Sequence, residues 1–133
     1  MIVRLIGVLL ALALFAVGKV ANAQHMNDAG APCSDKVVTV EAYNCFQSAA
    51  TSADKRLNQR YNKILAKLSP NEQNALRNAE RLWVQFRDAT CAAERGLYDG
   101  GTAAGVAFVA CIEEETRLRE IDLLTVYQWR LEK

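Results

Sequence analysis

The sequence predicts an all-α fold: a small up-down-up bundle of three main helices, held by two disulfides. Three long stretches carry apolar or small residues every three or four positions, as the buried face of a helix requires. No stretch shows the strict alternation of apolar and polar residues that is typical of a half-buried strand. The chain also has an even number of cysteines, which in an exported protein indicates disulfides: Cys33, Cys45, Cys91 and Cys111.

Residues 1–23 have the pattern of a secretory signal peptide. Arg4 supplies a positive start, residues 5–17 are apolar, and Ala21-Asn22-Ala23 matches a small-residue cleavage site. The apolar segment is shorter than the roughly 20 residues of a membrane span, which disfavours the alternative of an uncleaved anchor. We therefore expect an exported chain that begins at Gln24, in the periplasm or secreted.

Charge and composition exclude several classes of partner. Loss of Arg4 and Lys19 with the signal leaves 14 basic and 15 acidic residues, a net charge of −1. Without a basic stripe, we expect no nucleic-acid partner and no stable membrane insertion after signal cleavage. The cysteine spacings fit no zinc pattern and the only histidine is His25, so we expect no metal or cofactor.

The first helix is predicted over 40–68. Residues 24–38 have turn-forming residues and no apolar periodicity at their start, which predicts a flexible leader before a helical domain over 39–131. Thr39 can cap the helix, and Glu41 lies in its first turn, where the helix dipole favours a carboxylate.

The second helix is predicted over 70–97. Ser69, Pro70 and Glu72 form the pattern of a capping box with proline at the first helical position. With almost no loop between them, the first two helices should form an antiparallel hairpin. The stretch 79–91 gives this helix an apolar face with two aromatic rings, Trp83 and Phe86, which the neighbouring helices should bury.

The third helix is predicted over 103–129. Asp99, Gly100 and Gly101 interrupt the helical pattern, and Thr102 can cap the third helix. At 1.5 Å per residue, all four cysteines then lie near one end of the bundle. The positions of the four cysteines along the bundle axis leave three pairings open. We favour Cys33–Cys45 and Cys91–Cys111 because each joins sequence neighbours.

The same helix lengths suggest side-chain partners between the second and third helices. Arg87 falls level with Glu114, which predicts a partly buried ion pair, and Arg117 falls level with Trp83, on which it can stack. Asp88 should face solvent. We interpret these charges as organising helix packing rather than binding a ligand.

The residue inventory argues against catalysis. His25 lies in the leader, so neither a Ser-His-Asp nor a Cys-His arrangement is expected. The carboxylates of 113–115 point in three directions on a helix, and Gly100-Gly101 lacks the pattern of a phosphate loop. We expect no catalytic residues and no enzyme.

A set of short motifs, in order, resembles the LprI-type lysozyme-inhibitor domain family, long described as a domain of unknown function in secreted bacterial proteins. The resemblance covers about 33–124 and implies a small, helical, disulfide-bonded exported domain. For the named member of that family it also implies inhibition of lysozyme. The lipid anchor common to that member is not expected here, since no cysteine directly follows the apolar segment. The residues that carry the resemblance are Cys33, Cys45, Leu57, Asn58, Tyr61, the stretch 79–88, Cys91, 100–102, Cys111, Thr116 and Arg117.

These observations lead to the hypothesis of an exported helical binding protein whose partner is a protein, with a lysozyme (muramidase) of the cell envelope as the candidate. The natural protrusion is the turn Tyr98, Asp99, Gly100, Gly101 and Thr102, although it can also serve only to connect two helices. An envelope interaction or structural module without lysozyme inhibition is the alternative, and a small hydrolase is a third. The sequence leaves the oligomeric state open.

Overall fold

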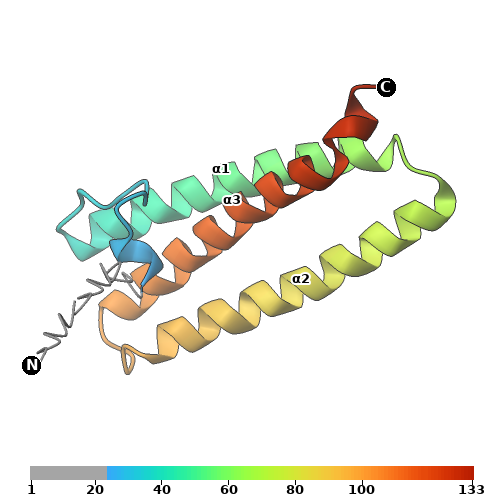
Figure 1. The fold of residues 1–133 in the computed structure, drawn as a ribbon. Helices are drawn as coiled ribbons and strands as arrows, with labels where there is room; N and C mark the ends of the chain where they lie inside the picture. Colours follow the sequence, from blue (N-terminus) through green and yellow to red (C-terminus); the bar gives the residue numbers. More distant parts are fainter. Residues whose placement is uncertain (1–23) are drawn as a thin grey trace, which may run out of the picture.

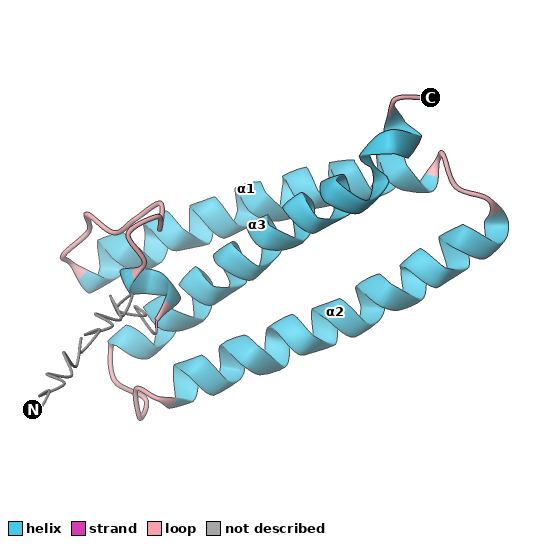
Figure 2. Cartoon of the chain, in the orientation of Figure 1, coloured by secondary structure: helices cyan, strands magenta, loops and turns pink. Residues whose placement is uncertain are grey.

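The structure is a computed structural model that describes residues 24–133; the predicted signal peptide lies outside the described residues. A short 3-10 helix, η1 (His25–Asn27), precedes three long helices: α1 (Thr39–Leu65), α2 (Pro70–Gly96) and α3 (Ala103–Leu131). The part of the chain that the structure describes contains no strand (Figure 2). The predicted all-α bundle with three main helices and two disulfides is confirmed.

The helix α3 is the centre of the bundle. Both α1 and α2 pack on α3, whereas α1 and α2 have at most marginal contact with each other. Figure 1 shows α2 standing apart from α1 and running antiparallel to both other helices. The up-down-up directions and the short antiparallel connection of α1 to α2 are as predicted, but the two helices lie apart over most of their lengths.

Two apolar clusters hold the bundle, one at each end. The first joins the leader, the start of α1 and the start of α3, and includes Phe46 and Val106. The second joins the far ends of all three helices through Leu57, Ile64, Leu68, Leu76 and Leu123.

The apolar face of α2 is only partly buried. Among its residues, Leu76, Cys91 and Glu94 alone are buried. Trp83 is half-buried, but Leu82 and Phe86 are 54% and 59% exposed. The prediction that neighbouring helices bury this face is therefore wrong for Phe86, because α3 covers one side of α2 and α1 does not cover the other.

The helix ends show which predicted caps form. The Ser69 backbone N–H donates to Glu72 Oε2 at 2.8 Å, and the Glu72 backbone N–H donates to Ser69 Oγ at 3.5 Å, so the predicted capping box is present. The predicted caps at Thr39 and Thr102 are not made. Thr39 is the first residue of α1, after Val38, and Thr102 has helical backbone angles in place of the extended geometry of a capping residue.

The segment predicted as a flexible leader packs on the bundle over much of its length. The helix η1 contacts α3, and both Ala31 and Cys33 are buried against the first apolar cluster. The Cys33–Cys45 disulfide joins this segment to α1. A leader without regular periodicity can thus still cover a core, because the cross-link and two small residues provide its contacts.

Both favoured disulfides are present. Cys33–Cys45 and Cys91–Cys111 have Cα–Cα separations of 6.0 and 5.4 Å, within the usual range. They lie at the same end of the bundle, where residues from the leader, α1, α2 and α3 meet.

Substituting Ser69→Ala should lower the free energy of unfolding by about 1 kcal/mol, because it removes the acceptor for the Glu72 backbone N–H. Chemical denaturation of the oxidised protein measures this change. Ser52→Ala, at an exposed position inside α1, is the matched control and should have little effect or a slight stabilising one. Equal losses in the two variants would contradict the role of the cap.

Replacing both cysteines of either pair with alanine should lower the free energy of unfolding by about 3 kcal/mol, because each cross-link restricts the unfolded chain. Denaturation of the two double variants measures this loss, and non-reducing peptide mapping of the unaltered protein checks the pairing. A map with Cys33 joined to Cys91 or Cys111 would contradict the structure.

Candidate partner-binding tip

The turn between α2 and α3 has a tightly defined backbone. Asp99 and Gly100 have left-handed angles, with φ of 47° and 73°. Aspartate and glycine are among the residues that adopt this region most readily. The Gly101 N–H donates to the Tyr98 carbonyl at 2.8 Å, and a Cβ on Gly101 would lie 3.1 Å from that oxygen. The predicted protrusion is therefore a specific turn that places Asp99 at the surface.

A disulfide and a backbone hydrogen bond fix the turn to the start of α3. The Cys91–Cys111 disulfide joins the last two turns of α2 to α3, and the Ala104 N–H donates to the Gly101 carbonyl at 3.0 Å. The Tyr98 hydroxyl is buried with no hydrogen-bond partner among the described residues. Burial, with a smaller contribution from the Glu94 carboxylate, raises the pKa of Tyr98. The phenol therefore remains neutral at pH 7, and its hydroxyl makes no hydrogen bond to the described part of the chain that would hold the turn.

An exposed apolar surface lies beside this turn. It comes from the residues that lead into α1, where Val37 is 95% exposed and Val40 is 68% exposed. Thr39, Val40 and Tyr43 line a mostly apolar hollow of about 350 Å³ together with Thr102 of the turn. Tyr43 packs within 3.5 Å of the position of a Cβ on Gly105, which brings α1 close to the start of α3. We call residues 37–43 and 97–102 together the tip.

The tip contains residues that are not predicted from the sequence as part of a binding surface. Val37, Val38 and Val40 follow Cys33 closely, in an irregular lead-in and the start of a helix. Their run of β-branched residues next to a predicted disulfide is the signal that could have identified them. Only the tertiary structure brings this run beside the α2–α3 turn.

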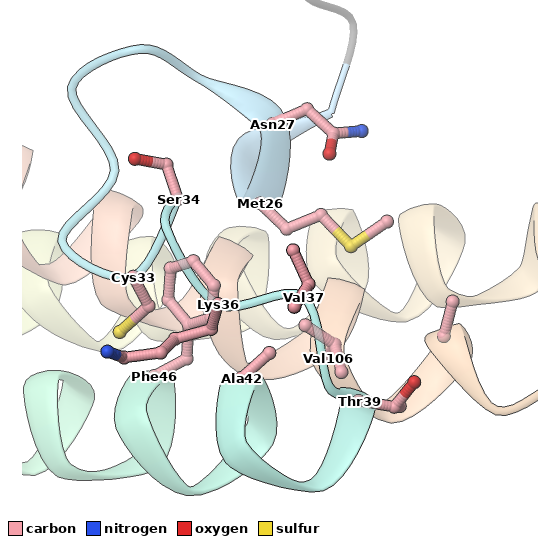
Figure 3. A pocket seen from close by; sticks show the side chains of 11 residues that line it. Met26, Asn27, Cys33, Ser34, Lys36, Val37, Thr39, Ala42, Phe46 and Val106 are labelled. Atoms are coloured by element: carbon pink, nitrogen blue, oxygen red, sulfur yellow. The ribbon is translucent and has the colours of Figure 1, made fainter.

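A second hollow, of about 160 Å³, lies behind the tip. Figure 3 shows Met26 of η1 and Val37 lying over Ala42, Phe46 and Val106. This space is small, and the leader forms one of its walls. We interpret it as imperfect packing under the leader.

The leader is also fixed by a polar contact. The His25 backbone N–H donates to Glu94 Oε1 at 3.1 Å, and the ring atom Nδ1 of His25 contacts Glu94 Oε2. Glu94 is a buried residue of α2, so this contact ties the leader to the helix beside the tip. Cys111 lies close to the pair, but its sulfur is engaged in a disulfide, so the three residues do not form a metal site.

The predicted pairing of Arg87 with Glu114 is not observed. Arg87 donates to Asp88 at 2.8 and 2.9 Å and to Thr116 Oγ1 at 3.4 Å, while its guanidinium lies 5.1 Å from the Trp83 ring centroid. Glu114 instead pairs with Arg117 at 3.4 Å, one turn along the same helix. Asp88 is exposed, as predicted.

The predicted stacking of Arg117 on Trp83 is not observed either. Arg117 lies between Glu113 and Glu114, at 3.3 and 3.4 Å, and these contacts within α3 hold it there. Arg119, two residues further on, faces α2, where it binds Glu80 and lies 5.9 Å from the Trp83 ring centroid. These charges therefore pair within α3 and between α2 and α3, with partners that differ from the predicted ones.

Several residues that carry the family resemblance line a groove of about 260 Å³ between α1 and α2. Several of its polar groups already have partners: Asn58 binds Asp54 within the lining, whereas Arg87 binds Asp88 and Arg81 binds Asn78 outside it. The groove therefore offers few unpaired groups to a ligand. Its lining residues are Asp54, Leu57, Asn58, Tyr61, Glu80, Arg81, Trp83, Val84 and Arg87.

Fold and tip define a small helical domain with two disulfides and an exposed apolar surface at one end. The family model described as Lysozyme inhibitor LprI matches residues 32–123, which is most of the chain, so the chain belongs to this family. Searches of curated proteins and of solved structures found no match. In the part of the chain that the structure describes, no helix has the length and apolar character that a bilayer crossing demands.

Substituting Glu113→Gln should stabilise the protein near pH 7. Burial raises the pKa of Glu113 above its ordinary value, although Arg117 offsets part of the effect. The folded state therefore binds this proton more tightly than the unfolded chain, and stability falls as the pH rises above 4.5 through the pKa of the folded state. The glutamine side chain carries no charge, so the gain should disappear as the pH falls below 4.5, where Glu113 is protonated in both states.

Denaturation of both proteins between about pH 4 and pH 8 measures this difference. A variant that is less stable than the parent near pH 7 would show that the Glu113–Arg117 contact outweighs the burial of the carboxylate.

Proposed function

We propose that this chain binds a lysozyme outside the cytoplasm and inhibits it by inserting the tip into the sugar-binding cleft. Family membership supports a lysozyme as the partner. The observation that carries the choice of surface is the exposed apolar run of Val37, Val38 and Val40 beside a braced turn. Exposed apolar residues gathered in one place mark interaction sites on small domains.

The architecture suits an inhibitor that acts by occlusion. The two disulfides and the His25–Glu94 contact hold the tip segments before a partner arrives. Binding by a surface that is already ordered loses less conformational entropy than binding by a loop that must become ordered. Asp99 places a carboxylate at the apex, where it would face cationic groups on a basic enzyme.

The location follows from the same features. Disulfides persist in oxidising compartments, and the N-terminal pattern predicts export. We therefore propose a periplasmic or secreted protein that acts as a binder and not as an enzyme. The family to which the chain belongs is described as a lysozyme inhibitor, which gives no support to the third hypothesis, a hydrolase.

The test is a titration of lysozyme activity with the mature chain, using representatives of several lysozyme classes. Val40→Ser and Asp99→Ala should each weaken inhibition at least several-fold, because one removes apolar contact and the other a charge at the apex. Val126→Ser is the matched control: Val126 is similarly exposed on α3 but lies near the opposite end of the bundle, so inhibition should be unchanged.

The absence of inhibition at micromolar excess for every lysozyme class tested would reject the proposal. In that case, the alternative of an envelope interaction module without lysozyme inhibition would account for the exposed tip. Inhibition that Val126→Ser weakens as much as Val40→Ser would place the binding surface elsewhere.

A further inference from the structure

A regular apolar stripe runs along the exposed side of α2. Its positions alternate in steps of four and three residues, as in the contact seam of a two-helix coiled coil. Every member is exposed, and this sets the stripe apart from the neighbouring residues that face α3. We call it the α2 stripe: Ala75, Ala79, Leu82, Phe86, Ala89 and Ala93.

The order of large and small side chains along the α2 stripe is the same in both directions. Counted outward from Val84, Leu82 corresponds to Phe86, Ala79 to Ala89, and Ala75 to Ala93. Two copies of α2 placed antiparallel about a two-fold axis near Val84 would therefore set each large side chain against a large one and each alanine against an alanine. Such self-complementarity is what a two-fold symmetric interface requires.

The helix α3 extends the apolar surface at the edge of the stripe. Leu118 and Ile121 are exposed on α3, and Leu118 is level with Leu82 because Glu80 binds Arg119 and Arg87 binds Thr116 nearby. The stripe itself spans about 27 Å of helix. A contact of this size lies at the small end of specific interfaces, so a micromolar rather than a nanomolar dissociation constant is expected.

We propose that two copies of this chain associate through the α2 stripe, with their α2 helices antiparallel about a two-fold axis near Val84. The tip lies at one end of each bundle, so this dimer leaves both tips accessible at opposite ends of the α2 pair. The inference is independent of lysozyme inhibition, because it uses none of the tip residues.

Sedimentation of the mature chain from about 1 to 500 μM should show a concentration-dependent dimer, a range chosen to bracket micromolar affinity. Phe86→Glu should shift the protein to monomer over this whole range with its helical circular dichroism retained. Val40→Glu is the matched control, since it places the same charge at a similarly exposed apolar position of the tip and should leave the dimer unchanged. A protein that remains monomeric throughout, or a dimer unaffected by Phe86→Glu, overturns the proposal.

Spin labels test the antiparallel orientation of the two α2 helices. In the antiparallel pair, labels at Gln85 lie about 3 Å apart along the helix axis, whereas labels at Asn71 lie about 39 Å apart. A parallel pair would bring both sets equally close and would contradict the proposal. Loss of lysozyme binding in Phe86→Glu, together with a monomeric parent, would instead assign the α2 stripe to the lysozyme.

Discussion

The attachment of α2 to α3 is the contact on which the rest of this molecule depends. The surface of α2 that meets α3 is of mixed character: Leu76 and Trp83 alternate with Glu80, Arg87 and Glu94. An apolar seam alone would not hold such a helix, so the Cys91–Cys111 disulfide at one end and the Leu76 cluster at the other act as two anchors. Between them, the Glu80–Arg119 pair and the Arg87–Thr116 bond set the register of the two helices.

This attachment explains why one face of α2 is open. A third helix packed in the groove between α2 and α3 would cover Leu82 and Phe86, but α1 packs on a different side of α3. The chain therefore keeps an apolar stripe in water, with alanine at four of its six positions to limit the exposed area. The stripe and the tip are separate surfaces, so the two proposed contacts, with a second copy and with a lysozyme, use different residues.

Local sequence signals predicted the helices, the capping box and the level of the cysteines well. The Ser69–Glu72 box depends only on four consecutive residues, and the gathering of the cysteines at one end follows from helix lengths that any straight helix obeys. Side-chain partners could not be predicted in the same way. A level along a helix axis does not determine which way a side chain points, so Arg119 rather than Arg117 lies at Trp83. The tip required two segments about 60 residues apart to meet, which no local pattern contains.

The two disulfides lie at one end of the bundle, so the helices separate less easily at that end than at the other. At the tip end, every long helix is covalently connected to a neighbouring segment, whereas the opposite end depends on side-chain packing and a helix cap. Thermal fluctuations should therefore separate the helices first at the junction of α1 and α2, with amide hydrogens there exchanging soonest. Partial melting would thus begin at the end remote from the tip and leave the braced end assembled.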